Sequence, residues 1–141
     1  MSLDRFLQAQ EKTYTGALAE LKAGRKTGHW IWWIFPQLKG LGTSHNSTYY
    51  GLADEAEARA YIRHPVLGPR YRECVREVHA QLMVHDKTPL ELMGSDIDVL
   101  KLRSSLGLFL QVAAESEPSL RADAAEVLAR LGERTRLGPR G

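Results

Sequence analysis

One stretch of the chain, residues 28–50 (GHWIWWIFPQLKGLGTSHNSTYY), contains all three tryptophans. Within it, residues 29–35 form an almost unbroken apolar and aromatic run, which is too short for an independent amphipathic helix and too bulky to remain in water. Pro36 then interrupts regular structure, because proline has no N–H to donate and restricts the residue before it. The stretch therefore predicts a buried aromatic anchor followed by a polar, glycine-containing loop, an arrangement that suits a small-molecule pocket.

The rest of the chain shows helical periodicity. Apolar residues recur at helical spacing while alternating strand patterns are scarce, and Gly24, Asp54 and the Thr88-Pro89 pair match helix-end signals. Residues 97–112 are the most apolar segment and are expected to form a central helix surrounded by others. The pattern predicts an all-α, compact, single-domain multihelical bundle of about six helices: 3–21, 53–64, 69–85, 90–93, 97–112 and 120–131. The domain is expected to span residues 1–132, and the arginine-rich residues 133–141 are expected to form a flexible basic tail.

Composition narrows the classes of partner. The chain has 141 residues, a formal net charge of +2 and a single cysteine, Cys74. One cysteine excludes an internal disulfide, and in a helical pattern it is expected to be a buried core residue. The N-terminus has no signal-peptide pattern and no apolar run is long enough to span a membrane. We therefore expect a cytoplasmic protein with no membrane or nucleic-acid partner, and the sequence leaves the oligomeric state open.

Motifs for metals, cofactors and nucleophilic catalysis are missing from the sequence. The histidines, His29, His45, His64, His79 and His85, are spread along the chain without the spacing of a helical zinc site, so no metal is expected. There is no Gly-x-Ser-x-Gly nucleophile motif, no Walker loop and no dinucleotide-binding fingerprint. The sequence therefore predicts no cofactor, assigns no catalytic residue and does not decide whether the protein is an enzyme.

Polar groups attached to the aromatic anchor are the remaining candidates for a ligand site. His29 could bind an anion or transfer a proton, or it could simply donate to a backbone carbonyl at a helix start. Asp98 and Lys101 lie one helical turn apart and are expected to pair. Lys101 and the serines that follow it lie in an apolar helix and need polar partners. The predicted ligand-binding residues are His29, Trp30, Trp33, Gln37, Ser44, Asn46, Lys101 and Ser104.

Several blocks of sequence, in order, resemble a known family. They are residues 5–10, 29–37 (HWIWWIFPQ), the Gly40-Leu41-Gly42 turn with Ser44, the Glu55-Ala56 and Ala60-Tyr61 pairs, residues 64–68 (HPVLG), and Lys101-Leu102 with Ser104, Ser105, Leu108 and Phe109. Together they are similar to the family of unknown function numbered 1810 (DUF1810), sometimes mislabelled calpastatin. The resemblance covers roughly residues 5–113. It implies a small bacterial protein with a compact multihelical fold, and it implies no particular activity.

Three hypotheses for function follow. The leading one is a pocket where residues 29–46 meet the Lys101 helix, suited to a nucleotide-like or other anionic aromatic ligand because aromatic rings lie beside positive charge. The second is an ADP-ribosyl-type hydrolase, on a loose resemblance to NADAR proteins; it requires a buried glutamate in the pocket, and Glu55 and Glu57 are both expected to be solvated. The third is a protein-interaction module in which Trp30, Trp32 and Trp33 form a surface patch.

Overall fold

The computed structural model describes residues 2–113 and 117–140, with side chains described as far as Gly132. Regular structure in this part of the chain is helical and contains no strand, so the all-α prediction is confirmed. Eight helices are found among these residues: α1 (Asp4–Ala23), α2 (Ile31–Ile34), α3 (His45–Tyr50), α4 (Glu55–Arg63), α5 (Leu67–Met83), α6 (Pro89–Met93), α7 (Asp96–Ala113) and α8 (Pro118–Arg140).

The two helices beyond the expected six, α2 and α3, are short and fall in the aromatic run and in the loop behind it. None of the described helices has the length and apolar character needed to cross a membrane. The predicted tail, residues 133–141, overlaps the end of α8, but its side chains and Gly141 lie outside the described residues. Its predicted flexibility stays a prediction.

Helix ends follow the signals seen in the sequence. Asp54 caps α4 by accepting from the Glu57 backbone N–H, and Thr88 forms a reciprocal capping box with Glu91 at the start of α6. Gly24 ends α1 with a φ of 82°, a left-handed conformation that glycine adopts without a steric penalty. These local interactions explain why the boundaries of α1, α4 and α6 were predictable.

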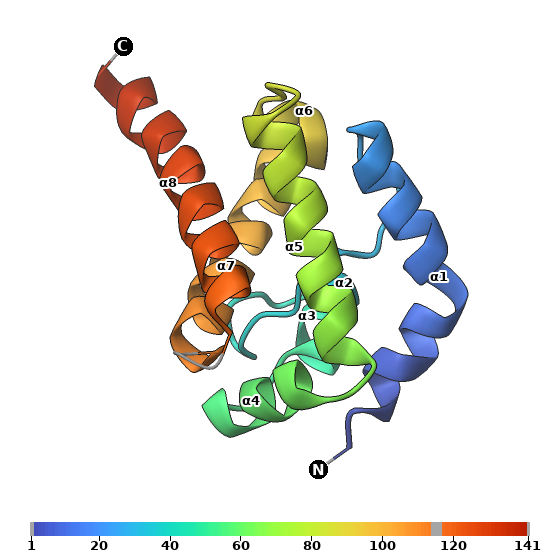
Figure 1. Ribbon diagram of the computed structural model, residues 1–141. Helices are drawn as coiled ribbons and strands as arrows, with labels where there is room; N and C mark the ends of the chain where they lie inside the picture. Colours follow the sequence, from blue (N-terminus) through green and yellow to red (C-terminus); the bar gives the residue numbers. More distant parts are fainter. Residues whose placement is uncertain (1, 114–116, 141) are drawn as a thin grey trace.

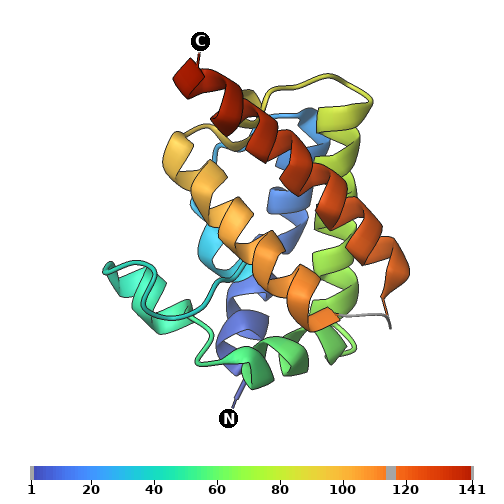
Figure 2. The ribbon, with the colours of Figure 1, turned by 90° about the vertical axis from the view of Figure 1, so that its left-hand side faces the viewer.

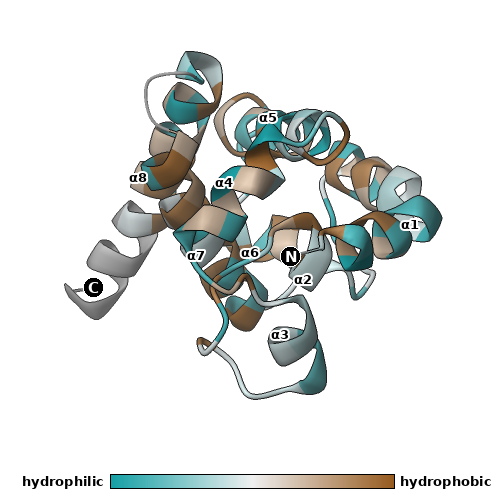
Figure 3. Ribbon diagram, turned by 90° about the horizontal axis from the view of Figure 1, so that it is seen from below, coloured by the Kyte–Doolittle hydropathy of each residue, from teal (hydrophilic) through white to brown (hydrophobic). Residues whose placement is uncertain are grey.

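The long helices surround one core. Helix α5 packs between α1 and α8, while α7 packs against α8 and α4 (Figure 1). Figures 2 and 3 show α3 and its preceding loop extending from one side of this bundle. Aromatic rings from four segments meet at the centre, where the centroids of Tyr71 and Phe109 are 4.4 Å apart and those of Phe6 and Tyr61 are 5.1 Å apart.

The aromatic run lies against this core, as its composition predicted. Trp30, Ile31, Ile34 and Phe35 are buried, whereas Trp32 and Trp33 are half-buried and pack against the same cluster. Buried polar groups fix the run in place: the Gln10 side-chain amide donates to the Trp33 carbonyl at 2.7 Å. The tryptophans are thus structural anchors, and they do not form the exposed patch that the interaction-module hypothesis required.

A buried ion pair joins the start of α1 to α4. Both terminal nitrogens of Arg5 donate to the Glu57 carboxylate, at 3.1 and 3.2 Å, and the Ala53 backbone N–H donates to it at 2.8 Å. Glu57 is only 3% exposed, so the expectation that it is solvated was wrong. Helical periodicity could not reveal this burial, because its partner Arg5 lies 52 residues earlier in the chain.

Candidate functional site

An open groove of about 350 Å³ lies between the first half of α7 and the loop that joins α2 to α3. A short backbone connection holds the loop: Leu52 N–H donates to the Gln37 carbonyl at 2.9 Å, and Lys39 N–H donates to the Leu52 carbonyl at 2.7 Å. The loop is therefore tied to the segment that follows α3. The lining residues are Gln37, Leu41 and Gly42 from the loop and Ile97, Leu100, Lys101, Arg103 and Ser104 from α7.

Two cationic side chains give the groove its charge. The Lys101 ammonium lies 4.6 Å from the centroid of the Trp32 ring, a cation–π contact. Arg103 is exposed, and neither cation forms an ion pair with a described residue. Since no carboxylate occurs among the described lining residues, the groove has an uncompensated positive edge.

The predicted pair between Asp98 and Lys101 is wrong. Asp98 instead accepts from the Lys26 ammonium at 2.7 Å, and Lys26 is only 7% exposed. A buried ammonium pairs with a carboxylate because an isolated charge is costly to remove from water. Lys101 is consequently left half-exposed at the groove, and it is not buried in the helix as the sequence suggested.

Of the eight predicted ligand-binding residues, the groove brings together Gln37, Lys101 and Ser104. Ser44 caps α3 by accepting from Ser47 N–H at 3.1 Å. Asn46 lies on α3 outside the described groove lining. Ser44 therefore has a structural role at the start of α3. Ligand binding by the three groove residues stays a prediction.

The remaining three residues lie elsewhere. Trp30 is buried and donates from its indole nitrogen to Glu20 at 3.0 Å, and Trp33 donates to Thr13 at 2.8 Å. His29 is exposed and borders a second hollow of about 160 Å³ together with Lys26 and Asp98. The leading hypothesis placed His29 and Lys101 at one pocket. In the structure they border two different hollows.

Glu20 organises the connection beside this second hollow. Its carboxylate accepts from the backbone N–H groups of Thr27 and Gly28, both at 2.8 Å, and from Trp30. Desolvation raises the pKa of Glu20, but the hydrogen bonds from Gly28, Thr27 and Trp30 lower it, and the net pKa is below the ordinary value. An ionised carboxylate thus holds the residues that lead into the aromatic run.

Five lining residues were not predicted from the sequence: Leu41, Gly42, Ile97, Leu100 and Arg103. A signal for part of this set was present, since positions 97, 100, 101 and 104 share one face of a helix by their i, i+3, i+4, i+7 spacing. We interpreted the apolar residues Ile97 and Leu100 on this face as part of the core. Only the packing shows that this face borders a groove.

Cys74 is not a candidate nucleophile. It is buried in α5, and burial raises the pKa of its thiol to about 12. The thiolate is the reactive form, so this thiol is almost entirely protonated at neutral pH. The prediction of a buried core cysteine is confirmed.

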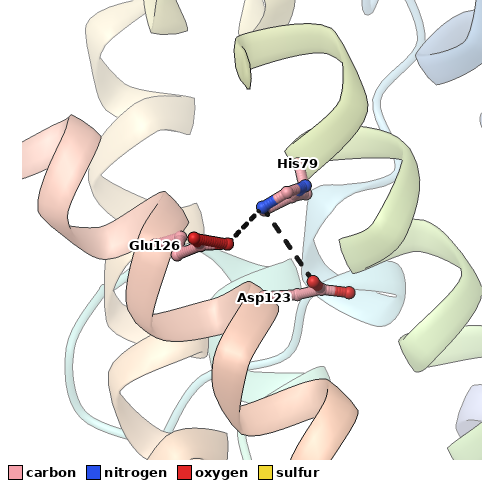
Figure 4. Close-up of side chains that lie close together, drawn as sticks. All are labelled: His79, Asp123 and Glu126. Atoms are coloured by element: carbon pink, nitrogen blue, oxygen red, sulfur yellow. Dashed lines mark hydrogen bonds and ion pairs between the residues drawn. The ribbon is translucent and has the colours of Figure 1, made fainter. Parts of the chain in front are cut away.

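Metal-ligating side chains gather at one place outside the groove. His79 of α5 lies beside Asp123 and Glu126 of α8, and one ligand atom from each falls within 4.8 Å of the others (Figure 4). The spacing of the histidines in the sequence did not reveal this cluster, because both carboxylates lie more than 40 residues after His79. This cluster shares no residue with the groove.

The fold and groove define a compact helical domain with an aromatic core and an open cationic groove on one helix. The family of proteins of unknown function DUF1810 matches residues 1–130, and the chain belongs to this family. The identification by resemblance is thereby confirmed. Among solved structures, the chain is similar to the conserved hypothetical protein Rv1873 from Mycobacterium tuberculosis, with 41% identity, a TM-score of 0.78, and coverage of 88% of this chain and 85% of the other. None of the curated proteins matches the chain.

Proposed function

We propose that this is a cytoplasmic protein whose α7 groove binds a small anionic ligand with an apolar or aromatic body, such as a nucleotide. The observation that carries the proposal is the pairing of positive charge with exposed apolar surface: Lys101 and Arg103 lie beside Ile97 and Leu100, which are 65% and 58% exposed. The volume of about 350 Å³ is at the lower end of the range for small-molecule sites.

The polar groups suit an anion with hydrogen-bonding edges. Lys101 and Arg103 offer charge-assisted donors, which bind phosphate or carboxylate more strongly than neutral donors do. Ser104 and Gln37 add a hydroxyl and an amide from opposite walls. The apolar side chains of Leu41, Ile97 and Leu100 would cover a base or another flat ring.

Trp32 offers a reporter for binding. Its ring is in contact with the Lys101 ammonium, and its indole N–H is buried with no acceptor among the described residues. An anion that draws the ammonium away from the ring would change the fluorescence of Trp32. Trp32→Phe should remove this signal while leaving calorimetric binding in place.

The test is isothermal titration calorimetry with AMP, ADP-ribose and uncharged adenosine. We expect AMP or ADP-ribose to bind more tightly than adenosine, and Lys101→Met to weaken that binding at least about tenfold, the effect of losing about 1.4 kcal/mol. Lys12→Met is the matched control, because it removes the same charge from an exposed position on α1. Equal affinities for the two variants, or no saturable binding of any probe, would contradict the proposal.

The exposed apolar residues also favour a second candidate, self-association through this face. Leu41 is 61% exposed and lies across the groove from Ile97 and Leu100. Apolar side chains gathered on a surface are typical of interaction sites. Light scattering coupled to size-exclusion chromatography should then show a dimer that Leu100→Asp converts to a monomer; a monomer at all concentrations would exclude this candidate.

The hydrolase alternative lacks its required glutamate. Glu57 is held in the ion pair with Arg5, and Glu55 pairs with Arg59 at 3.4 Å. Neither residue is among those that line the groove. We therefore rest the proposed function on binding alone and assign no reaction.

A further inference from the structure

The cluster of His79, Asp123 and Glu126 lies where α5 and α8 pack together. The Nε2 atom of His79 is 2.6 Å from Oε1 of Glu126 and 4.0 Å from Oδ1 of Asp123. The two carboxylates are one helical turn apart on α8, so both can face α5 (Figure 4). Three side chains from two helices thus direct ligand atoms to one point.

The surroundings leave this point open to ions from solvent. The side chains of His79 and Asp123 are each 24% exposed, and that of Glu126 is 61% exposed. Glu126 also borders a hollow of about 230 Å³ with Met83, Ala129 and Arg130. A hydrated cation could therefore reach the cluster without any rearrangement of the core.

Charge at the cluster is not balanced by a permanently cationic side chain. Among the described residues, neither Asp123 nor Glu126 pairs with a lysine or arginine. Arg130, which borders the adjoining hollow, instead donates to the Leu82 carbonyl at 2.8 Å and lies 3.8 Å from Asp86. Two carboxylates facing one imidazole repel each other unless a cation, either the imidazolium itself or a metal ion, lies between them.

We propose that His79, Asp123 and Glu126 form a binding site for a divalent transition metal, with Zn²⁺ as the best match to the donors. One imidazole nitrogen and two carboxylate oxygens are typical ligands for this ion, and water completes its coordination. With bonds of about 2.1 Å, tetrahedral ligand atoms lie roughly 3.4 Å apart. The observed separations of 2.6 and 4.0 Å lie on either side of that value, so small side-chain rotations would bring all three donors into place.

The metal would join α8 to α5. The inner face of α8 already packs its buried residues Leu120, Ala124, Val127 and Leu131 onto the bundle. A metal with ligands from both helices adds a link that exists only when the two are docked, so binding should stabilise the folded state. This role is independent of the α7 groove and of any ligand bound there.

Titration of the tag-free, chelator-treated protein with ZnCl₂ by calorimetry tests the proposal. We expect one saturable site per chain and a rise in Tm of several degrees at saturating zinc. Asp123→Asn is the most informative variant, because Asp123 makes no hydrogen bond in the cluster and its loss should leave the fold intact. Zinc affinity should fall at least about tenfold in Asp123→Asn and in His79→Gln, and the rise in Tm should disappear.

His85→Gln is the matched control, since it removes an exposed histidine from the loop after α5. It should bind zinc as the unmodified chain does. Anomalous diffraction at the zinc edge should place the ion between His79 and Asp123. If zinc gives no saturable heat, or if Asp123→Asn binds as tightly as the unmodified chain, the cluster is only a hydrogen-bonded ion pair and the proposal is wrong.

Discussion

The two halves of α7, residues 96–104 and 105–113, have different surroundings. In the second half, Leu106 and Phe109 are fully buried, covered by α4 and α8, whereas Leu102 is the one buried residue of the first half. In the first half, Ile97 and Leu100 are 65% and 58% exposed. The expectation of a helix surrounded along its whole length therefore holds only for the second half.

Adjacent serines show the difference most directly. Ser105 is fully buried, and its hydroxyl lies 2.9 Å from the Tyr71 hydroxyl, so both polar groups are satisfied inside the core. Ser104 is half-buried and lines the groove with Lys101. One step along a helix turns a side chain by about 100°, which is enough to pass from core to groove.

The first half of α7 is held in place by charge. The carboxylate of Asp98 accepts from the buried ammonium of Lys26, which also donates to the Gly28 carbonyl at 2.5 Å. This attachment positions the first half without covering it. The second half of α7 thus contributes to the core, while the first half leaves Ile97 and Leu100 exposed beside the groove.

The largest expected effect comes from truncating the buried half. Phe109→Ala should lower the free energy of unfolding by about 3–5 kcal/mol, because it leaves a cavity beside Tyr71 and Tyr61. Leu100→Ala, the matched change in the exposed half, should alter it by less than about 0.5 kcal/mol. Urea unfolding followed by tryptophan fluorescence measures both, and equal losses would refute the division of α7 into two halves.

A smaller effect should separate the adjacent serines. Ser105→Ala leaves the buried Tyr71 hydroxyl without its partner and should cost about 1–3 kcal/mol in unfolding free energy. Ser104→Ala should change stability by less than about 0.5 kcal/mol and should instead weaken ligand binding in the groove. If urea denaturation gives the two variants the same stability, Ser105 is not the structural member of the pair.

The smallest expected effect is a loss of stability in mild alkali, caused by ionisation of the Cys74 thiol, which is buried in α5. Burial raises the pKa of Cys74 to about 12 in the folded protein, whereas an unfolded cysteine has a pKa of about 8.5. A raised pKa means that this stability is fully present below about pH 8.5 and is lost as the pH rises toward 12. Between about pH 8 and pH 9.5 the unfolding free energy should fall by about 1 kcal/mol.

Cys74→Ala provides the control for this pH dependence. The variant should be less stable near neutral pH because a buried side chain is truncated, but its stability should fall less steeply as the pH rises from about 8 to about 9.5. Urea midpoints measured at several pH values give both slopes. Parallel slopes would show that Cys74 does not contribute to the alkaline loss.

A minority of the residues that line the groove were predictable from the sequence. Gln37, Lys101 and Ser104 were predicted and line one groove, whereas Leu41, Gly42, Ile97, Leu100 and Arg103 were not predicted. The aromatic run reaches the groove through Trp32, whose ring contacts Lys101, but Trp30 and Trp33 are anchors with hydrogen-bonding partners on α1. Apolar side chains on a helix give the same sequence pattern whether another element covers them or not.

The amino-acid sequence by itself determined the all-helical class, the main helices, several caps and the burial of the tryptophan run, because these depend on residues a few positions apart. Only the tertiary structure decided that Asp98 pairs with Lys26, 72 residues away, and that His79 meets Glu126, 47 residues away. Such contacts depend on how whole helices pack, and the charge left on Lys101 follows from that packing.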